Sequence, residues 1–118
     1  FLGSCSVRKE HDEARNILIR DIEFEELTAG EYTGYYEGGM YEWRENECLV
    51  RTGHGELIHI ELIFTREDLQ DGFIEELYEK VLKRQSLDID VNTGATLTSK
   101  AHLKAVENAL LKAINNNN

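Results

Sequence analysis

Four hydroxyl side chains fall within seven positions of the sequence DVNTGATLTSKA, residues 90–101, just ahead of a helix-forming segment. The N-terminus of a helix presents unpaired N–H groups and a partial positive charge, which together favour an anion. Gly94 lets a ligand approach the backbone closely. Thr96, Thr98 and Ser99 offer oxygens that can accept hydrogen bonds or carry a covalent group. The motif therefore suits a phosphate-bearing group, although threonine and serine before a helix are more often simple caps.

The histidines and aromatic residues give no second candidate of equal strength. The histidines are scattered along the chain, at His11, His54, His59 and His102. None has the paired spacing of a metal site or a nucleophile beside it in sequence, so we predict no metal site, no catalytic set, and histidines of the surface or core. The aromatic side chains that could stack on a ligand lie in strand-like stretches, where core or cross-strand packing is commoner: Tyr32, Tyr35, Tyr36, Tyr41 and Trp43.

The two cysteines have different surroundings. Cys48 lies in an apolar stretch, which predicts a small core residue. Cys5 ends the sequence Leu-Gly-Ser-Cys, residues 2–5, which resembles the cleavage box of a bacterial lipoprotein. A chance match of four ordinary residues is the alternative. We expect Cys5 to become the acylated first residue of the mature protein, which would attach an extracytoplasmic domain to the cell membrane by a lipid anchor.

Length and charge restrict the class of protein further. The chain has 118 residues, enough for one small domain, and no apolar run approaches the roughly 20 residues of a membrane-spanning helix. Asp and Glu outnumber Lys and Arg 23 to 13, for a net charge of -10. Such a chain is unsuited to nucleic acid, whose phosphates are neutralised by clustered basic side chains. We expect a lipoprotein-like leader and tether over 1–16, a folded domain over 17–114 and a polar tail over 115–118.

Periodicity in the first half of the chain predicts strands. Alternating apolar residues predict a strand over 17–27. The aromatic stretch 31–36 predicts a second strand, which the following Gly-Gly pair ends. Residues 40–52 and 57–65 predict two more strands, joined by a glycine-rich turn into an antiparallel hairpin.

The second half of the chain predicts two amphipathic helices. The first would begin at Thr65 as its N-cap, with an apolar stripe at Leu69, Phe73, Leu77 and Val81. The second would follow the hydroxyl-rich motif, with Thr98 or Ser99 as its cap and a stripe at Leu103, Val106 and Leu110. Strands followed by helices predict an α+β domain, a small antiparallel β-sheet covered on one face by two main helices.

The motif and its surroundings resemble the FMN-binding domain family, whose members include flavin-carrying subunits of the sodium-pumping quinone reductase and of the Rnf complex. The family signature is an Asp, two variable residues, Ser or Thr, and then Gly-Ala-Thr, and residues 90–96 match every fixed position. Residues 30–34 resemble the family's Asp-Gly-x-Tyr-x-Gly segment and residues 105–110 its closing helix. Thr93 stands where Ser is commoner and keeps the hydroxyl.

This resemblance implies that FMN is bound covalently, through a phosphoester to the side-chain oxygen of Thr96. A separate flavin transferase, which uses FAD and magnesium, would make the bond. The domain would thus be a substrate and then an electron carrier for membrane redox partners, and not an enzyme. Asp90 would help the transferase to align the loop, while Gly94 and Ala95 keep the space around Thr96 open. The other motif residues expected beside the flavin are Thr93, Leu97, Thr98 and Ser99.

Two alternatives stay open at this point. The domain could hold FMN without a covalent bond, as a module that reduces a small substrate. It could also be a flavin-free adhesion or interaction domain of the same fold. Bound colour would separate the last possibility from the others, and denaturation would separate covalent from non-covalent flavin.

Overall fold

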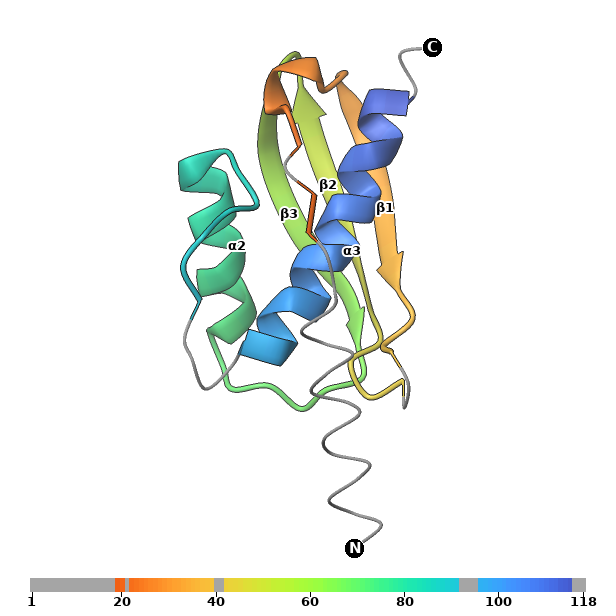
Figure 1. Ribbon diagram of the computed structural model, residues 1–118, viewed down its shortest axis with the longest axis vertical. Helices are drawn as coiled ribbons and strands as arrows, with labels where there is room; N and C mark the ends of the chain where they lie inside the picture. Colours follow the sequence, from red (N-terminus) through yellow and green to blue (C-terminus); the bar gives the residue numbers. More distant parts are fainter. Residues whose placement is uncertain (1–18, 21, 40–41, 92–95, 116–118) are drawn as a thin grey trace, which may run out of the picture.

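The computed structural model describes residues 19, 20, 22–39, 42–91 and 96–115. A short 3-10 helix, η1, precedes three strands and two helices. Their bounds are η1 Phe24–Glu26, β1 Gly30–Tyr36, β2 Asn46–Gly53, β3 Glu56–Thr65, α2 Phe73–Arg84 and α3 Thr96–Asn115. The strands form one antiparallel sheet in the order β1-β2-β3. Helix α3 crosses β1 and β2, and α2 lies beside β3 (Figure 1). The predicted α+β class is confirmed.

The predicted hairpin is also confirmed, with Gly53 of β2 opposite Glu56 of β3. The pairing of these two strands shifts its register twice, between Glu47 and Cys48 and between Arg51 and Thr52. On β3 the residues passed over by the shifts are Ile58 and Ile63, which are about half exposed. Bulges of this kind bend a strand and interrupt its ladder locally.

The strand predicted over 17–27 is wrong for the part of this segment that the structure describes. Ile22, Phe24 and Leu27 are buried, which explains the alternating pattern, but the chain turns between them. The backbone N–H groups of Glu26 and Leu27 donate to the carbonyls three residues before them, so η1 satisfies its polar groups locally instead of pairing with the sheet. Apolar residues two or three positions apart are compatible with a β-strand and with a 3-10 turn alike.

Two other boundaries differ from the prediction. Strand β2 begins only at Asn46, after a turn at Glu42–Arg44, and Glu42 has a positive φ of 58° that a strand does not contain. Helix α2 begins at Phe73, and Gly72, with φ 85°, takes the N-cap position, so Thr65 is not its cap. The Thr65 side chain belongs to the end of β3 and makes other contacts, described below.

Helix α3 buries the stripe that the sequence predicts. Leu103, Val106 and Leu110 are at most 4% exposed. Ala105 and Ala109 are wholly buried and face β1 at Gly34. A Cβ atom at Gly34 would lie 1.9 Å from the carbonyl oxygen of Ala105 and 2.6 Å from the backbone nitrogen of Ala109. Helix and strand therefore approach so closely that only glycine fits at this point.

Gly34→Ala should lower the free energy of unfolding by about 1–3 kcal/mol or more, because the added methyl group meets helix backbone that cannot yield without moving α3. Urea unfolding followed by circular dichroism measures the change. Thr33→Ala, the half-buried neighbour, is the matched control and should change stability less. A Gly34→Ala protein as stable as the wild type would contradict the close approach.

Candidate functional site

The last residues of the motif form the first turn of α3. Thr96 is the first residue of the helix, and Leu97, Thr98 and Ser99 follow within its first turn. Thr98 and Ser99 are thus inside the helix, and the prediction that one of them caps it is wrong. Asp90 is exposed in the connection after α2. Three predicted residues of the motif, Thr93, Gly94 and Ala95, lie outside the described residues, as does Cys5.

The three described hydroxyls differ in their environment. Thr98 Oγ1 donates a hydrogen bond of 2.8 Å to Glu67 Oε2. Ser99 is only 2% exposed. Thr96 is half-buried at the helix end. Thr96 and Thr98 are therefore half-buried alike, and Thr98 is distinguished by its bond to Glu67 and Ser99 by its burial.

A buried histidine holds this turn of the helix to the end of β3. His102 is fully buried, and its Nδ1 lies 2.9 Å from the carbonyl oxygen of Thr98. Its Nε2 lies 3.2 Å from Thr65 Oγ1. Because a carbonyl only accepts, Nδ1 carries the proton and donates it, and Nε2 accepts from the Thr65 hydroxyl. The backbone N–H of Glu67 donates to Thr65 Oγ1 at 3.3 Å, which completes the connection.

Burial lowers the pKa of His102, while its hydrogen bond to the Thr98 carbonyl raises that pKa less. A neutral imidazole suits a network with one donated and one accepted hydrogen bond. Sequence analysis had placed His102 only as a surface or core histidine. Its position four residues after Thr98, and therefore on the same helix face, is the signal that could have linked it to the motif.

Two basic side chains lie close to this end of α3. Lys80 Nζ donates to the Asp90 carbonyl at 3.2 Å, so a cation of α2 is beside the first residue of the motif. Arg44 Nε is 3.9 Å from Glu67 Oε2, and both side chains are mostly buried. The first turn of α3 contains no acidic residue. Local charge at the helix start is therefore compatible with an anion, with the Glu67 carboxylate and Glu76, which pairs with Lys80 at 3.9 Å, as opposing groups.

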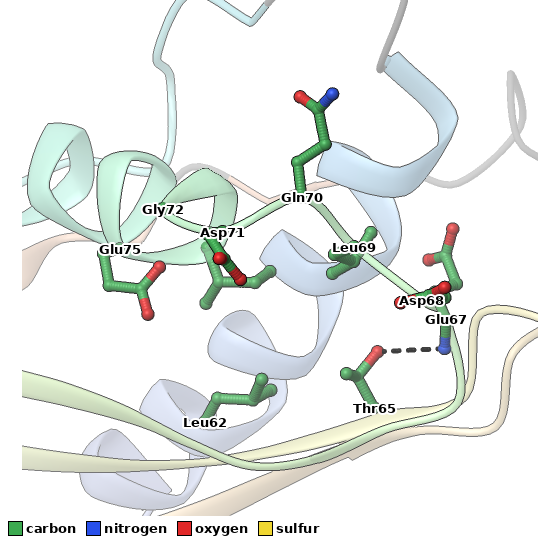
Figure 2. A pocket seen from close by; sticks show the side chains of 10 residues that line it. Leu62, Thr65, Glu67, Asp68, Leu69, Gln70, Asp71, Gly72 and Glu75 are labelled. Carbon is green, nitrogen blue, oxygen red and sulfur yellow. Dashed lines mark hydrogen bonds between the residues drawn. The ribbon is translucent and has the colours of Figure 1, made fainter.

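Two hollows adjoin this region. One of about 20 Å³ between α2 and α3, lined by Phe73, Lys80 and Ser99, has room for little more than a water molecule. The other, about 470 Å³, lies between the end of β3 and the start of α2 (Figure 2). Glu67, the partner of Thr98, is one of the residues that line it. Small-molecule sites span roughly 300–1,000 Å³, so the second hollow is large enough for a cofactor ring.

The larger hollow combines apolar and acidic side chains. Figure 2 shows Leu62 of β3 facing Leu69 across the hollow. Its acidic lining residues are Glu67, Asp68, Asp71 and Glu75. An uncharged, flat ring can lie against the leucines, whereas a phosphate would be repelled by the carboxylates. The residues present therefore fit a ring in the hollow and a phosphate at the helix end.

The other histidines and Cys48 lie away from this network. His54 and His59 are exposed, and His11 lies outside the described residues. Cys48 is fully buried, and burial raises the pKa of its thiol to about 12, so it is not a reactive thiolate. Within the part of the chain that the structure describes, no cluster of His, Cys, Asp and Glu could hold a metal ion, and no helix is long and apolar enough to cross a membrane.

The aromatic residues divide into two groups. Tyr32 and Tyr36 are partly buried against the core, as expected for strand aromatics. Tyr35 and Trp43 are about half exposed. Trp43 precedes Arg44, whose guanidinium is beside Glu67, and exposed Phe64 precedes Thr65, so both aromatic residues are neighbours in sequence of this network. Tyr41 lies outside the described residues.

Comparison with known proteins identifies the kind of domain and its fold. Residues 14–111 match the sequence profile of the FMN-binding domain. The fold is similar to the crystal structure of the CPE2226 protein from Clostridium perfringens, with a TM-score of 0.62 and 21% sequence identity over 76% of this chain and 91% of that one. Comparison with curated proteins gave no match.

Replacing His102 should reduce stability and change its dependence on pH. At about pH 8, His102→Asn should lower the free energy of unfolding by about 1–3 kcal/mol, because buried hydrogen bonds are lost. The wild type should lose stability as the pH falls through 6.5, the ordinary value of histidine, because the unfolded chain then binds a proton that the folded chain excludes. Urea unfolding at about pH 8 and about pH 5 measures both effects.

The His102→Asn variant lacks this titrating group, so it should lose less stability than the wild type between about pH 8 and about pH 5. His59→Asn is the matched control, since His59 is exposed, and should keep the wild-type dependence on pH. Equal losses in the wild type and in His102→Asn would show that His102 is not held neutral.

Proposed function

Because the chain belongs to the FMN-binding domain family, we propose that it carries FMN esterified to Thr96 and transfers electrons as a domain outside the cytoplasm. FMN supplies one-electron and two-electron chemistry that protein side chains lack. The observation that carries the choice of residue is the arrangement of hydroxyls on α3. Thr98 is hydrogen-bonded to Glu67 and Ser99 is buried, while Thr96 is half-buried at the helix start.

The attachment is a group transfer that leaves the oxidation state unchanged. The Thr96 oxygen bonds to the phosphorus of the FMN half of FAD, the bond joining the two phosphates breaks, and AMP leaves. The hydroxyl proton passes to a base of the separate transferase, and magnesium neutralises the phosphates of FAD. The chain itself presents the nucleophile in a defined position, since the network of His102, Thr65 and Glu67 fixes the turn that follows it.

The resulting phosphodiester keeps one negative charge. The positive end of the helix dipole at the start of α3 stabilises such a charge, by roughly 0.3–1 kcal/mol where the helix start is exposed. Lys80 is placed to add to this effect, and Arg44 offsets the carboxylate of Glu67. Exposed Asp90 remains available as the contact through which a transferase aligns the loop.

The hollow in Figure 2 supports a place for the flavin ring. Leu62 and Leu69 provide apolar surface, and Glu67 joins the hollow to the turn that contains Thr98. The carboxylates around it disfavour additional negative charge on a reduced ring. A carrier in this environment gives up its electrons readily.

Membrane attachment is a separate part of the proposal. The box at residues 2–5 supports a lipid anchor at Cys5, which would hold the domain beside membrane redox partners. A non-covalent FMN module that reduces a small substrate is the competing function. The hydroxyl at the first position of α3 favours covalent attachment.

Thr96→Ala should abolish covalent flavin attachment. The wild-type protein, incubated with a matching transferase, FAD and magnesium, should gain the mass of one FMN and remain yellow after acid precipitation. Thr98→Ala, the matched control, should still be labelled, because its hydroxyl is engaged with Glu67. Thr96→Ser should keep part of the labelling, since it retains the oxygen. Flavin mapped to Thr98, or a covalently yellow Thr96→Ala protein, would refute the assignment.

Cys5→Ala in the full-length precursor should stop lipid labelling and release the domain from membranes. One acyl chain binds a membrane only marginally, so a diacylated cysteine is the form that would anchor the domain. Metabolic labelling with a fatty acid and membrane fractionation test this point. Cys48→Ala is the control, because Cys48 is buried and should leave labelling unchanged. A Cys5→Ala protein that stays labelled would disprove the anchor.

A further inference from the structure

Strand β3 has a free edge that faces a groove. Among the residues that the structure describes, β3 is the last strand of the sheet, and no described strand pairs with its outer backbone groups. A groove of about 540 Å³ runs between this edge and α2. On the β3 side it is lined by four consecutive residues, His59–Leu62. Side chains of consecutive strand residues point to opposite faces, so a groove that all four of them line follows the backbone edge and not one face of the sheet.

The free edge has defined ends. Ile58 and Ile63, the bulged residues of β3, stand immediately before and after His59–Leu62. Beyond Ile58, the side-chain amide of Gln85 occupies the edge: its Oε1 accepts from the Leu57 N–H and its Nε2 donates to the Leu57 carbonyl, both at 2.9 Å. A side chain thus makes at Leu57 the two hydrogen bonds that an added strand would make. The open edge is therefore limited to a segment of four residues.

Helix α2 supplies the other wall. Ile74, Tyr78 and Leu82, spaced four residues apart, give it an apolar floor. Glu75 and Glu79 stand exposed along the same wall, and Glu61 lies on the strand side. An extended segment in this groove would find backbone partners on one side, apolar contacts below and carboxylates along its rim.

We propose that this groove binds a short extended peptide segment of a partner protein, in which basic residues alternate with apolar ones, by adding it as a strand to β3. Main-chain hydrogen bonds would provide affinity and the alternating side chains specificity. A second copy of this chain is disfavoured, because each copy would bring the same glutamates and a net charge of -10 to the contact. A basic segment is complementary to the rim.

The test uses the full chain and a fluorescent hexapeptide of alternating lysine and valine, with blocked ends. Fluorescence anisotropy should show saturable binding, and amide NMR shifts should centre on His59–Leu62. The same peptide with alternate backbone nitrogens methylated keeps its charge but loses strand hydrogen bonds, so it should bind at least about tenfold more weakly. Equal binding of the two peptides would overturn strand addition and leave only charge attraction.

Variants of the rim separate this groove from the rest of the acidic surface. The double variant Glu75→Gln with Glu79→Gln should weaken binding. The control double variant Glu23→Gln with Glu25→Gln changes the net charge equally, at exposed residues outside the groove, and should bind like the wild type. Equal weakening by both pairs, NMR shifts on another face or dimerisation through β3 would each overturn the proposal.

Discussion

The close contact of α3 with β1 at Gly34 is the constraint on which the rest of the structure depends. A glycine on the strand and two alanines on the helix bring the backbones so near that the helix cannot slide along the sheet. The start of α3 is thereby fixed beside the last residue of β3 and the first residue of β2. Asn46, at the start of β2, donates from Nδ2 to the Ala101 carbonyl at 3.2 Å, and Thr65 of β3 meets His102. Packing along the helix thus positions Thr96.

Helix α3 buries two ionisable side chains and satisfies them differently. His102 stays neutral because burial lowers its pKa and both ring nitrogens have partners. Glu107, 1% exposed, accepts from the backbone N–H of Arg20 at 2.8 Å and from Lys104 Nζ at 3.0 Å. His102 thus joins the helix to β3, and Glu107 joins the helix to the chain before η1. Buried polar groups with complete partners fix one arrangement of elements more strictly than apolar packing does.

The sequence predicted what depends on local pattern and missed what depends on distant partners. The buried stripe of α3 could be predicted from the helical spacing of its apolar residues. The hairpin of β2 and β3 could be predicted from the glycines of its turn. The segment before β1 failed because alternate burial fits a strand and a 3-10 turn equally. Thr65 has the residue type of a cap, yet its partner His102 is 37 residues away. Glu67, which engages Thr98 across 31 residues, could not be found from spacing at all.

An acidic protein can hold a phosphate because electrostatic interactions in salt are local. At physiological ionic strength exposed charges are screened beyond about 8 Å, so the net charge of -10 matters less to the start of α3 than Lys80, Arg44 and the helix amides do. The net charge acts instead on association, where it repels acidic proteins and attracts basic ones. Under the proposals above, local cations at the helix start would retain the cofactor, while carboxylates elsewhere would select partners.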